Sequence, residues 1–93
     1  LKDMPDDYVL QVPAKMTANG PEVIELGLTA KTTTGLLHTI KNFERLTIEG
    51  YVNRDENLIK QAMLIHPLGP NESQLEGLWK RLKEVNKDYF VEF

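Results

Sequence analysis

The chain has 93 residues, enough for one compact domain and too few for two. Hydrophobic residues make up 41% and charged residues 27%, which is typical of a globular chain and excludes disorder as the default state. No cysteine is present, so disulfides, thiolate metal sites and cysteine catalysis are excluded within the chain. The net charge of −3 gives no basic field for nucleic acid or anionic lipid, and no apolar run approaches the ~20 residues of a membrane span.

A β-hairpin is predicted over residues 8–26. Apolar side chains alternate along residues 8–12 with the period of a strand, and Pro13 requires a sheet edge or the end of that strand. Asn19-Gly20 is a strong signal for a tight turn because both residues tolerate positive φ. Residues 22–26 are then predicted to form the second strand.

The first helix is predicted over residues 33–52. Two apolar lines run along it at helical spacing, Leu36, Ile40, Phe43 and Leu46 in one and Leu37, Ile48 and Val52 in the other. Apolar residues on two sides of a helix indicate that it is sandwiched between neighbours. Gly50 lies within this pattern and lowers helix propensity by about 1 kcal/mol relative to alanine. It marks either close packing of another helix or the end of this one.

Two further helices are predicted over residues 54–66 and 72–89. Asn53 and Asn71 are each followed three residues later by an acid or an amide, the spacing of a capping box. His66-Pro67 ends the second helix, because the residue before proline disfavours helical geometry. The third helix has the clearest periodicity, through Leu75, Leu78, Trp79, Leu82, Val85 and Tyr89. The predicted fold class is therefore α+β, with an N-terminal hairpin followed by three helices.

Few residues suit catalysis or metal binding. His38 and His66 are the only histidines, whereas a zinc site needs three or four ligands with a recognisable spacing. Ser73, the single serine, lies in the first turn of a predicted helix without a G-x-S-x-G motif. The six glycines are dispersed and form no phosphate-binding loop. We therefore predict no catalytic, cofactor-binding or metal-binding residue within this chain.

Trp79 has two interpretations. Together with its leucine neighbours it forms either a stripe that binds a partner or part of the core, and core packing is the stronger expectation. The basic residues around it alternate with acidic ones, as on a solvated helix surface.

The whole chain, residues 1–93, is expected to be a C-terminal segment of a larger protein. It starts at Leu1 with no signal-peptide pattern. A domain of this size buries only a little over ~60% of its unfolded surface, so it is marginally stable alone.

Five stretches resemble the C-terminal region of family 4 glycoside hydrolases, in the same order. The family patterns are D-x-x-V-x-V-P, a hairpin turn, E-x-L-T-V-E-A, A-L-x-A-L-L-x-H-P-L and L-x-x-A-N-K-x-Y. The matching stretches are Asp6–Pro13, Asn19–Pro21, Phe43–Gly50, Leu58–Leu68 and Leu82–Phe90. Gln11 stands where the family usually has Glu, Gly50 where it usually has Ala, and residues 28–34 match poorly.

The resemblance implies part of the C-terminal α+β domain that family 4 glycosidases share with lactate dehydrogenase. It implies a cytoplasmic, oligomeric parent enzyme of 6-phospho-glucosidase type, whose partners for this segment are an N-terminal NAD-binding domain and a second copy. Such enzymes use NAD and a divalent metal, commonly manganese, and oxidise C3, remove the C2 proton, eliminate the aglycone and reverse these steps. The family's metal-binding cysteine and histidine, glycine-rich loop and base lie upstream, so none is assigned here.

Two alternative functions remain open from the sequence. One is a stand-alone helical interaction module that presents the Trp79 helix, and the other is the C-terminal part of a hydroxyacid dehydrogenase. The sugar, its linkage and its phosphorylation also remain open.

Overall fold

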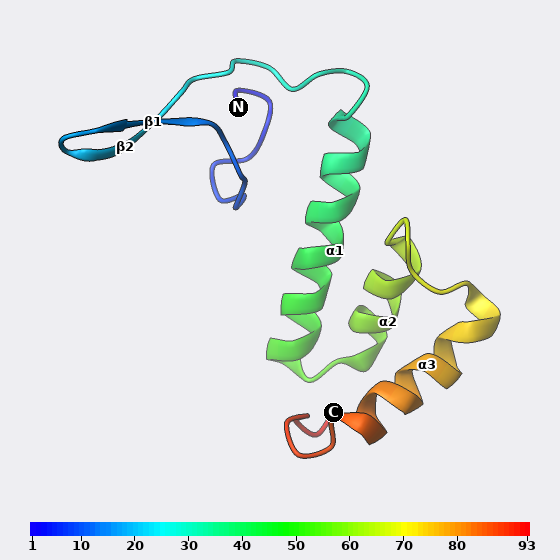
Figure 1. Cartoon of the computed structure of the whole chain (residues 1–93). Coiled ribbons are helices and arrows are strands. Elements are labelled where there is room, and N and C mark those ends of the chain that lie inside the picture. The colour runs from blue at the N-terminus through cyan, green and yellow to red at the C-terminus, as the bar shows by residue number, and fades with distance from the viewer. The chain divides into compact units, whose positions relative to one another are not determined.

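The computed structural model describes all 93 residues, which form two units, Leu1–Gly35 and Leu36–Phe93. Two strands precede three helices (Figure 1). They are β1 Ala14–Thr17, β2 Gly20–Val23, α1 Thr34–Asn53, α2 Glu56–Ile65 and α3 Glu72–Val85. This order confirms the predicted α+β class. None of the three helices is both long enough and apolar enough to span a membrane.

The hairpin turns one residue earlier than the Asn-Gly pair suggests. β1 and β2 are antiparallel, with Thr17 opposite Gly20, so Ala18 and Asn19 form the turn. Gly20 has a φ of 101°, a backbone geometry that residues with a Cβ rarely adopt. Gly20 is therefore required at the first position of β2. The Thr17 hydroxyl donates to the Gly20 carbonyl at 2.8 Å.

The hairpin is shorter than the predicted range 8–26, because residues 8–13 lie outside the strands. The Pro13 carbonyl accepts from the Ile24 amide at 3.0 Å, so proline precedes β1 instead of ending it. Beyond β2 the chain bonds to the N-terminus, where the Lys2 amide donates to the Gly27 carbonyl at 2.7 Å. The alternating residues 8–12 thus do not form the strand that their pattern predicts.

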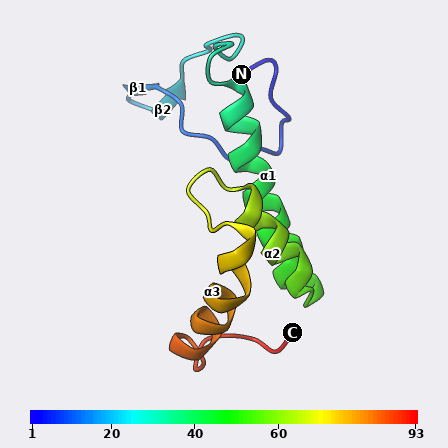
Figure 2. The same cartoon turned by 90° about the vertical axis from the view of Figure 1, so that its right-hand side faces the viewer.

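In the second unit, α2 runs back alongside the C-terminal half of α1, and α3 follows beyond a short loop (Figure 2). Gly50 is buried where α1 meets α2: a Cβ added there would lie 2.5 Å from the Ile59 Cγ1 atom and 3.1 Å from the Ile59 amide nitrogen. Of the two interpretations of this glycine, close helix packing is therefore the correct one. Ala62, Leu75 and Trp79 are the buried apolar side chains of this unit.

α1 ends in a tight reversal that satisfies its last carbonyls. The Asp55 amide donates to the Gly50 carbonyl at 2.8 Å and the Arg54 amide to the Tyr51 carbonyl at 3.3 Å. This is the pattern of a Schellman motif, and Arg54 takes its left-handed position with a φ of 56°.

The caps of α2 and α3 test the two predicted capping boxes. The N-cap expected at Asn53 is wrong, because α1 extends through that residue and Asp55 caps α2 instead, its carboxylate accepting from the Asn57 amide at 2.9 Å. The box at Asn71 and Gln74 is confirmed, with reciprocal bonds of 3.0 and 3.2 Å.

α3 ends at Val85, four residues before the predicted position 89. Asn86 caps it, since both its amide and its side-chain Nδ2 donate to the Leu82 carbonyl, at 3.2 and 2.9 Å. The chain then turns, because the amides of Tyr89 and Phe90 both donate to the Asn86 carbonyl.

Candidate functional site

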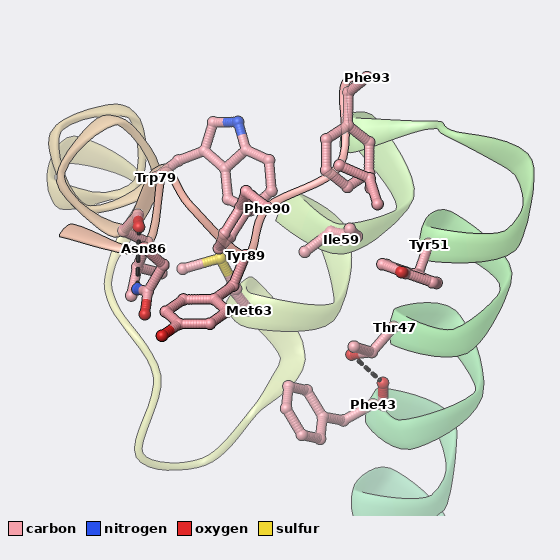
Figure 3. Close-up of a pocket in the computed structure, with 12 residues that line it drawn as sticks. Phe43, Thr47, Tyr51, Ile59, Met63, Trp79, Asn86, Tyr89, Phe90 and Phe93 are labelled. Atoms are coloured by element: carbon pink, nitrogen blue, oxygen red, sulfur yellow. Dashed lines mark hydrogen bonds between the residues drawn. The ribbon is translucent and has the colours of Figure 1, made fainter. Parts of the chain in front are cut away.

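An apolar cleft of about 400 Å³ lies within the second unit (Figure 3). Its helical wall consists of Phe43, Thr47 and Tyr51 from α1, Ile59 and Met63 from α2, and Trp79 and Leu82 from α3. The Thr47 hydroxyl donates to the Phe43 carbonyl of its own helix at 2.8 Å. The cleft therefore presents almost entirely carbon atoms to whatever fills it.

The residues after α3 complete the cleft. Phe90 and Phe93 face Trp79 edge-on, with ring centroids 5.6 and 5.5 Å from the indole. Trp79 is only 4% exposed, which confirms the core interpretation over a partner-binding stripe. Sequence reasoning missed the two phenylalanines as cleft residues, although two aromatic residues spaced three apart after the last helix were the available signal.

A cluster of charges holds the other edge of the indole. The Trp79 Nε1–H donates to the Glu56 Oε2 atom at 2.7 Å, across a sequence separation of 23 residues. The Lys60 and Lys83 Nζ atoms lie 3.5 and 3.6 Å from the same carboxylate, and Lys60 also pairs with Glu76 at 2.9 Å. These contacts tie α3 to the start of α2.

The charges shift two pKa values in the directions that keep both groups ionised. The Trp79 hydrogen bond lowers the pKa of Glu56 below its ordinary 4.5, with help from Lys60 and Lys83 and against the effect of partial burial. The hydrogen bond to Glu76 raises the pKa of Lys60 above its ordinary 10.5. A carboxylate that stays ionised and bonded to an indole suits positioning, not proton donation.

The other polar candidates have structural contacts. His66 caps the C-terminus of α2, where its Nδ1 accepts from the Leu68 amide at 3.0 Å and its ring packs edge-on against Phe43 at 4.6 Å. The Ser73 hydroxyl donates to Asn71 at 2.7 Å within the cap of α3. No three His, Cys, Asp or Glu side chains gather so as to hold a metal ion.

Comparison with known proteins gives the family. Residues 1–69 match the Family 4 glycosyl hydrolase C-terminal domain. The chain therefore belongs to family 4 of the glycosyl hydrolases, as the five similar stretches indicated.

Two curated relatives are 6-phospho-β-glucosidases. The chain is 34% identical over 89 residues to 6-phospho-beta-glucosidase BglT of Thermotoga maritima, and 32% identical over 93 residues to a probable 6-phospho-beta-glucosidase of Bacillus subtilis. The alignments cover 96% and 100% of this chain and 21% of each relative. The chain thus spans about a fifth of the length of these enzymes.

A solved structure agrees over the whole chain. The 6-phospho-beta glucosidase of T. maritima, in a structure with manganese, NAD+ and glucose-6-phosphate, superimposes with a TM-score of 0.86 at 32% identity. The match covers 100% of this chain and 23% of that one.

The residues of this chain do not fit the cofactors of that relative. No group of potential metal ligands lies together, and the glycines are spread over both units instead of forming one phosphate-binding loop. We therefore derive no step through NAD or manganese on this chain.

Proposed function

We propose that this chain is the C-terminal segment of a 6-phospho-glucosidase, and that it forms part of the substrate domain beside an N-terminal NAD-binding domain. The agreement of fold over the whole chain, at a TM-score of 0.86, supports this proposal most strongly. The two relatives described above, at 34% and 32% identity, are named 6-phospho-β-glucosidases, whereas maltose-6'-phosphate glucosidases and 6-phospho-α-glucosidases match at 24–29%. The higher identities favour β-linked, 6-phosphorylated glucosides as the substrate class. A charged sugar phosphate crosses a bilayer poorly, so a cytoplasmic location fits this substrate.

The whole protein would use NAD and manganese for the oxidation and elimination steps described above. Within that protein this chain has a structural role, because its charged residues link helices to one another and its cleft is apolar. Burial of Trp79 argues against the stand-alone interaction module, and the family match argues against the hydroxyacid dehydrogenase.

The chain alone is expected to hydrolyse no 6-phospho-glucoside and to bind neither NAD nor manganese in calorimetric titration, because cofactor binding needs backbone donors and ligands that it lacks. Joined in place of the matching C-terminal fifth of the T. maritima enzyme, it is expected to support manganese- and NAD-dependent hydrolysis of 4-nitrophenyl β-glucoside 6-phosphate. The control is the same enzyme without that fifth.

Two results would contradict this proposal. One is micromolar binding of NAD or manganese by the chain alone. The other is a folded chimera that binds NAD and hydrolyses neither α- nor β-linked 6-phospho-glucosides.

We also propose that the apolar surface of α1 contacts the NAD-binding domain or a second copy in the whole protein. Leu36, Ile48 and Val52 are 55%, 62% and 69% exposed, although they belong to the apolar lines of this helix. Apolar surface left in water costs roughly 25 cal/mol per Å², so it favours association.

The chain alone is therefore expected to self-associate at micromolar concentration, and Ile48→Asp is expected to restore the monomer. Sedimentation velocity measures this directly. Val85→Asp is the matched control, because Val85 is 63% exposed on α3. A sharp monomer with a cooperative melt in the unsubstituted chain would refute association.

A further inference from the structure

Asn19 is the one asparagine of the chain that a glycine follows. Each of the other five precedes a residue with a bulky side chain. Three of these five lie within helices, namely Asn42, Asn53 and Asn57. The remaining two, Asn71 and Asn86, use their carboxamides in the caps of α3. Asn19 therefore differs from every other asparagine both in its neighbour and in its place in the fold.

The carboxamide of Asn19 is exposed in the turn between β1 and β2, and it makes no hydrogen bond. Only the backbone amide of this residue is bonded, to the Thr17 hydroxyl oxygen at 3.2 Å. A Cβ added at Gly20 would meet nothing within 4 Å, so no neighbouring group shields this side of the turn. The carboxamide can therefore rotate freely towards the peptide nitrogen of Gly20.

Little holds the Gly20 amide in the hairpin. β1 and β2 pair over four residues each, and a hairpin of two strands is only marginally stable in water. Met16 and Val23 are 74% and 68% exposed, so these apolar side chains add little packing to the pairing. The turn is therefore expected to open much more often than the helices of the second unit, and each opening frees the Gly20 nitrogen.

We propose that Asn19 is a site of spontaneous deamidation, with water as the only co-reactant. The Gly20 nitrogen gives up its proton and attacks the Asn19 Cγ atom. The new N–Cγ bond closes a cyclic imide, while the Cγ–Nδ2 bond breaks and Nδ2 takes up a proton and leaves as ammonia. Water then opens the imide at either carbonyl, which yields aspartate or isoaspartate. Because the two reacting groups lie on adjacent residues, the attack has the advantage of an intramolecular reaction.

The reaction changes both the charge and the geometry of the turn. Either product carries a carboxylate in place of the carboxamide, so the net charge of the chain goes from −3 to −4. In isoaspartate the backbone also runs through the former side chain and is one atom longer. The Thr17 hydroxyl now accepts from the Asn19 amide and donates to the Gly20 carbonyl at 2.8 Å. A longer turn cannot keep both bonds, so isoaspartate is expected to loosen the hairpin.

The test incubates the 93-residue chain in heavy-oxygen water at mildly alkaline pH, followed by tryptic digestion in ordinary water and mass spectrometry. Asn19 lies in the peptide Met16–Lys31, which contains no other asparagine. This peptide is expected to exchange its amide for a heavy-oxygen carboxylate at least about tenfold faster than the peptide that contains Asn57, because a turn opens more readily than a helix. Asn19→Gln is the matched control, since its longer side chain would have to close a larger ring, and the reaction in this peptide should disappear.

Equal rates at Asn19 and Asn57 would overturn the proposal. So would a rate at Asn19 that is more than about a hundredfold lower in the folded chain than in urea, because the hairpin would then hold the Gly20 amide closed. Hydrogen exchange of the Lys15 and Glu22 amides, which lie in the paired strands, tests the effect on the hairpin. It should be faster in the purified isoaspartate product, and exchange equal to that of the starting chain would refute the loosening.

Discussion

Replacement of Gly50 by alanine is expected to destabilise the protein by about 1–3 kcal/mol, the usual cost of overpacking a close contact. The added Cβ would lie 2.5 Å from the Ile59 Cγ1 atom and 3.0 Å from the Asp55 carbonyl oxygen. The second contact is with backbone at the reversal between α1 and α2, which a rotamer change cannot relieve. The helices would have to separate, and the packing between them would weaken.

Gly77 supplies the matched control for this substitution. It lies within α3, and a Cβ added there would meet nothing within 4 Å. Gly77→Ala should therefore stabilise the protein by about 0.5–1 kcal/mol through helix propensity alone. Urea unfolding followed by circular dichroism measures both changes. Equal stabilisation by the two substitutions would show that α2 does not pack against Gly50 as the structure has it.

Alanine is expected to lower stability at Gly50 and to raise it at Gly77, a difference that could not be predicted from the sequence. Both occur inside helical patterns, and local propensity treats them alike. Only the packing of α2 against α1 distinguishes the two glycines. That packing depends on the reversal at Arg54, whose left-handed backbone could not be predicted because arginine rarely adopts it. The same reversal moved the α2 cap from Asn53 to Asp55.

Elements whose signals are local could be predicted. The capping box of α3 needs only Asn71 and Gln74, and the hairpin turn needs only a glycine that tolerates positive φ, so both could be read from a few adjacent residues. The bounds of the hairpin could not be predicted in this way, because alternation in residues 8–12 does not show whether a partner strand exists.

The cleft was the least predictable part of the second unit. Helical periodicity continues through Tyr89, yet α3 ends at Val85 because Asn86 caps it and the following rings pack back on Trp79. The indole contacts Phe90 and Phe93 after α3 and also donates a hydrogen bond to Glu56 on α2. Periodicity describes one helix at a time and contains no information on such contacts.

Replacement of Trp79 by alanine is expected to lower the free energy of unfolding by about 3–5 kcal/mol, as for other buried aromatic residues. The indole is 4% exposed and contacts the rings of Phe90 and Phe93, so a large cavity would remain. Native domains have only about 5–15 kcal/mol of stability, so this loss would remove a large share of it. Urea unfolding by circular dichroism measures the loss, and a change below about 1 kcal/mol would contradict the burial.

Trp79→Phe separates the ring from its hydrogen bond, because phenylalanine keeps an aromatic ring and lacks the N–H donor. The pKa of Glu56 should then rise towards its ordinary 4.5, since the indole bond is the largest cause of its depression. A depressed carboxylate pKa adds stability above the unfolded-state pKa, and this contribution disappears as pH falls through the folded-state value. In Trp79→Phe the loss of stability on acidification below about pH 5 should therefore be smaller. Carbon-13 NMR titration of the Glu56 carboxyl tests the pKa directly, and an identical titration in both proteins would show that the indole does not bond to Glu56.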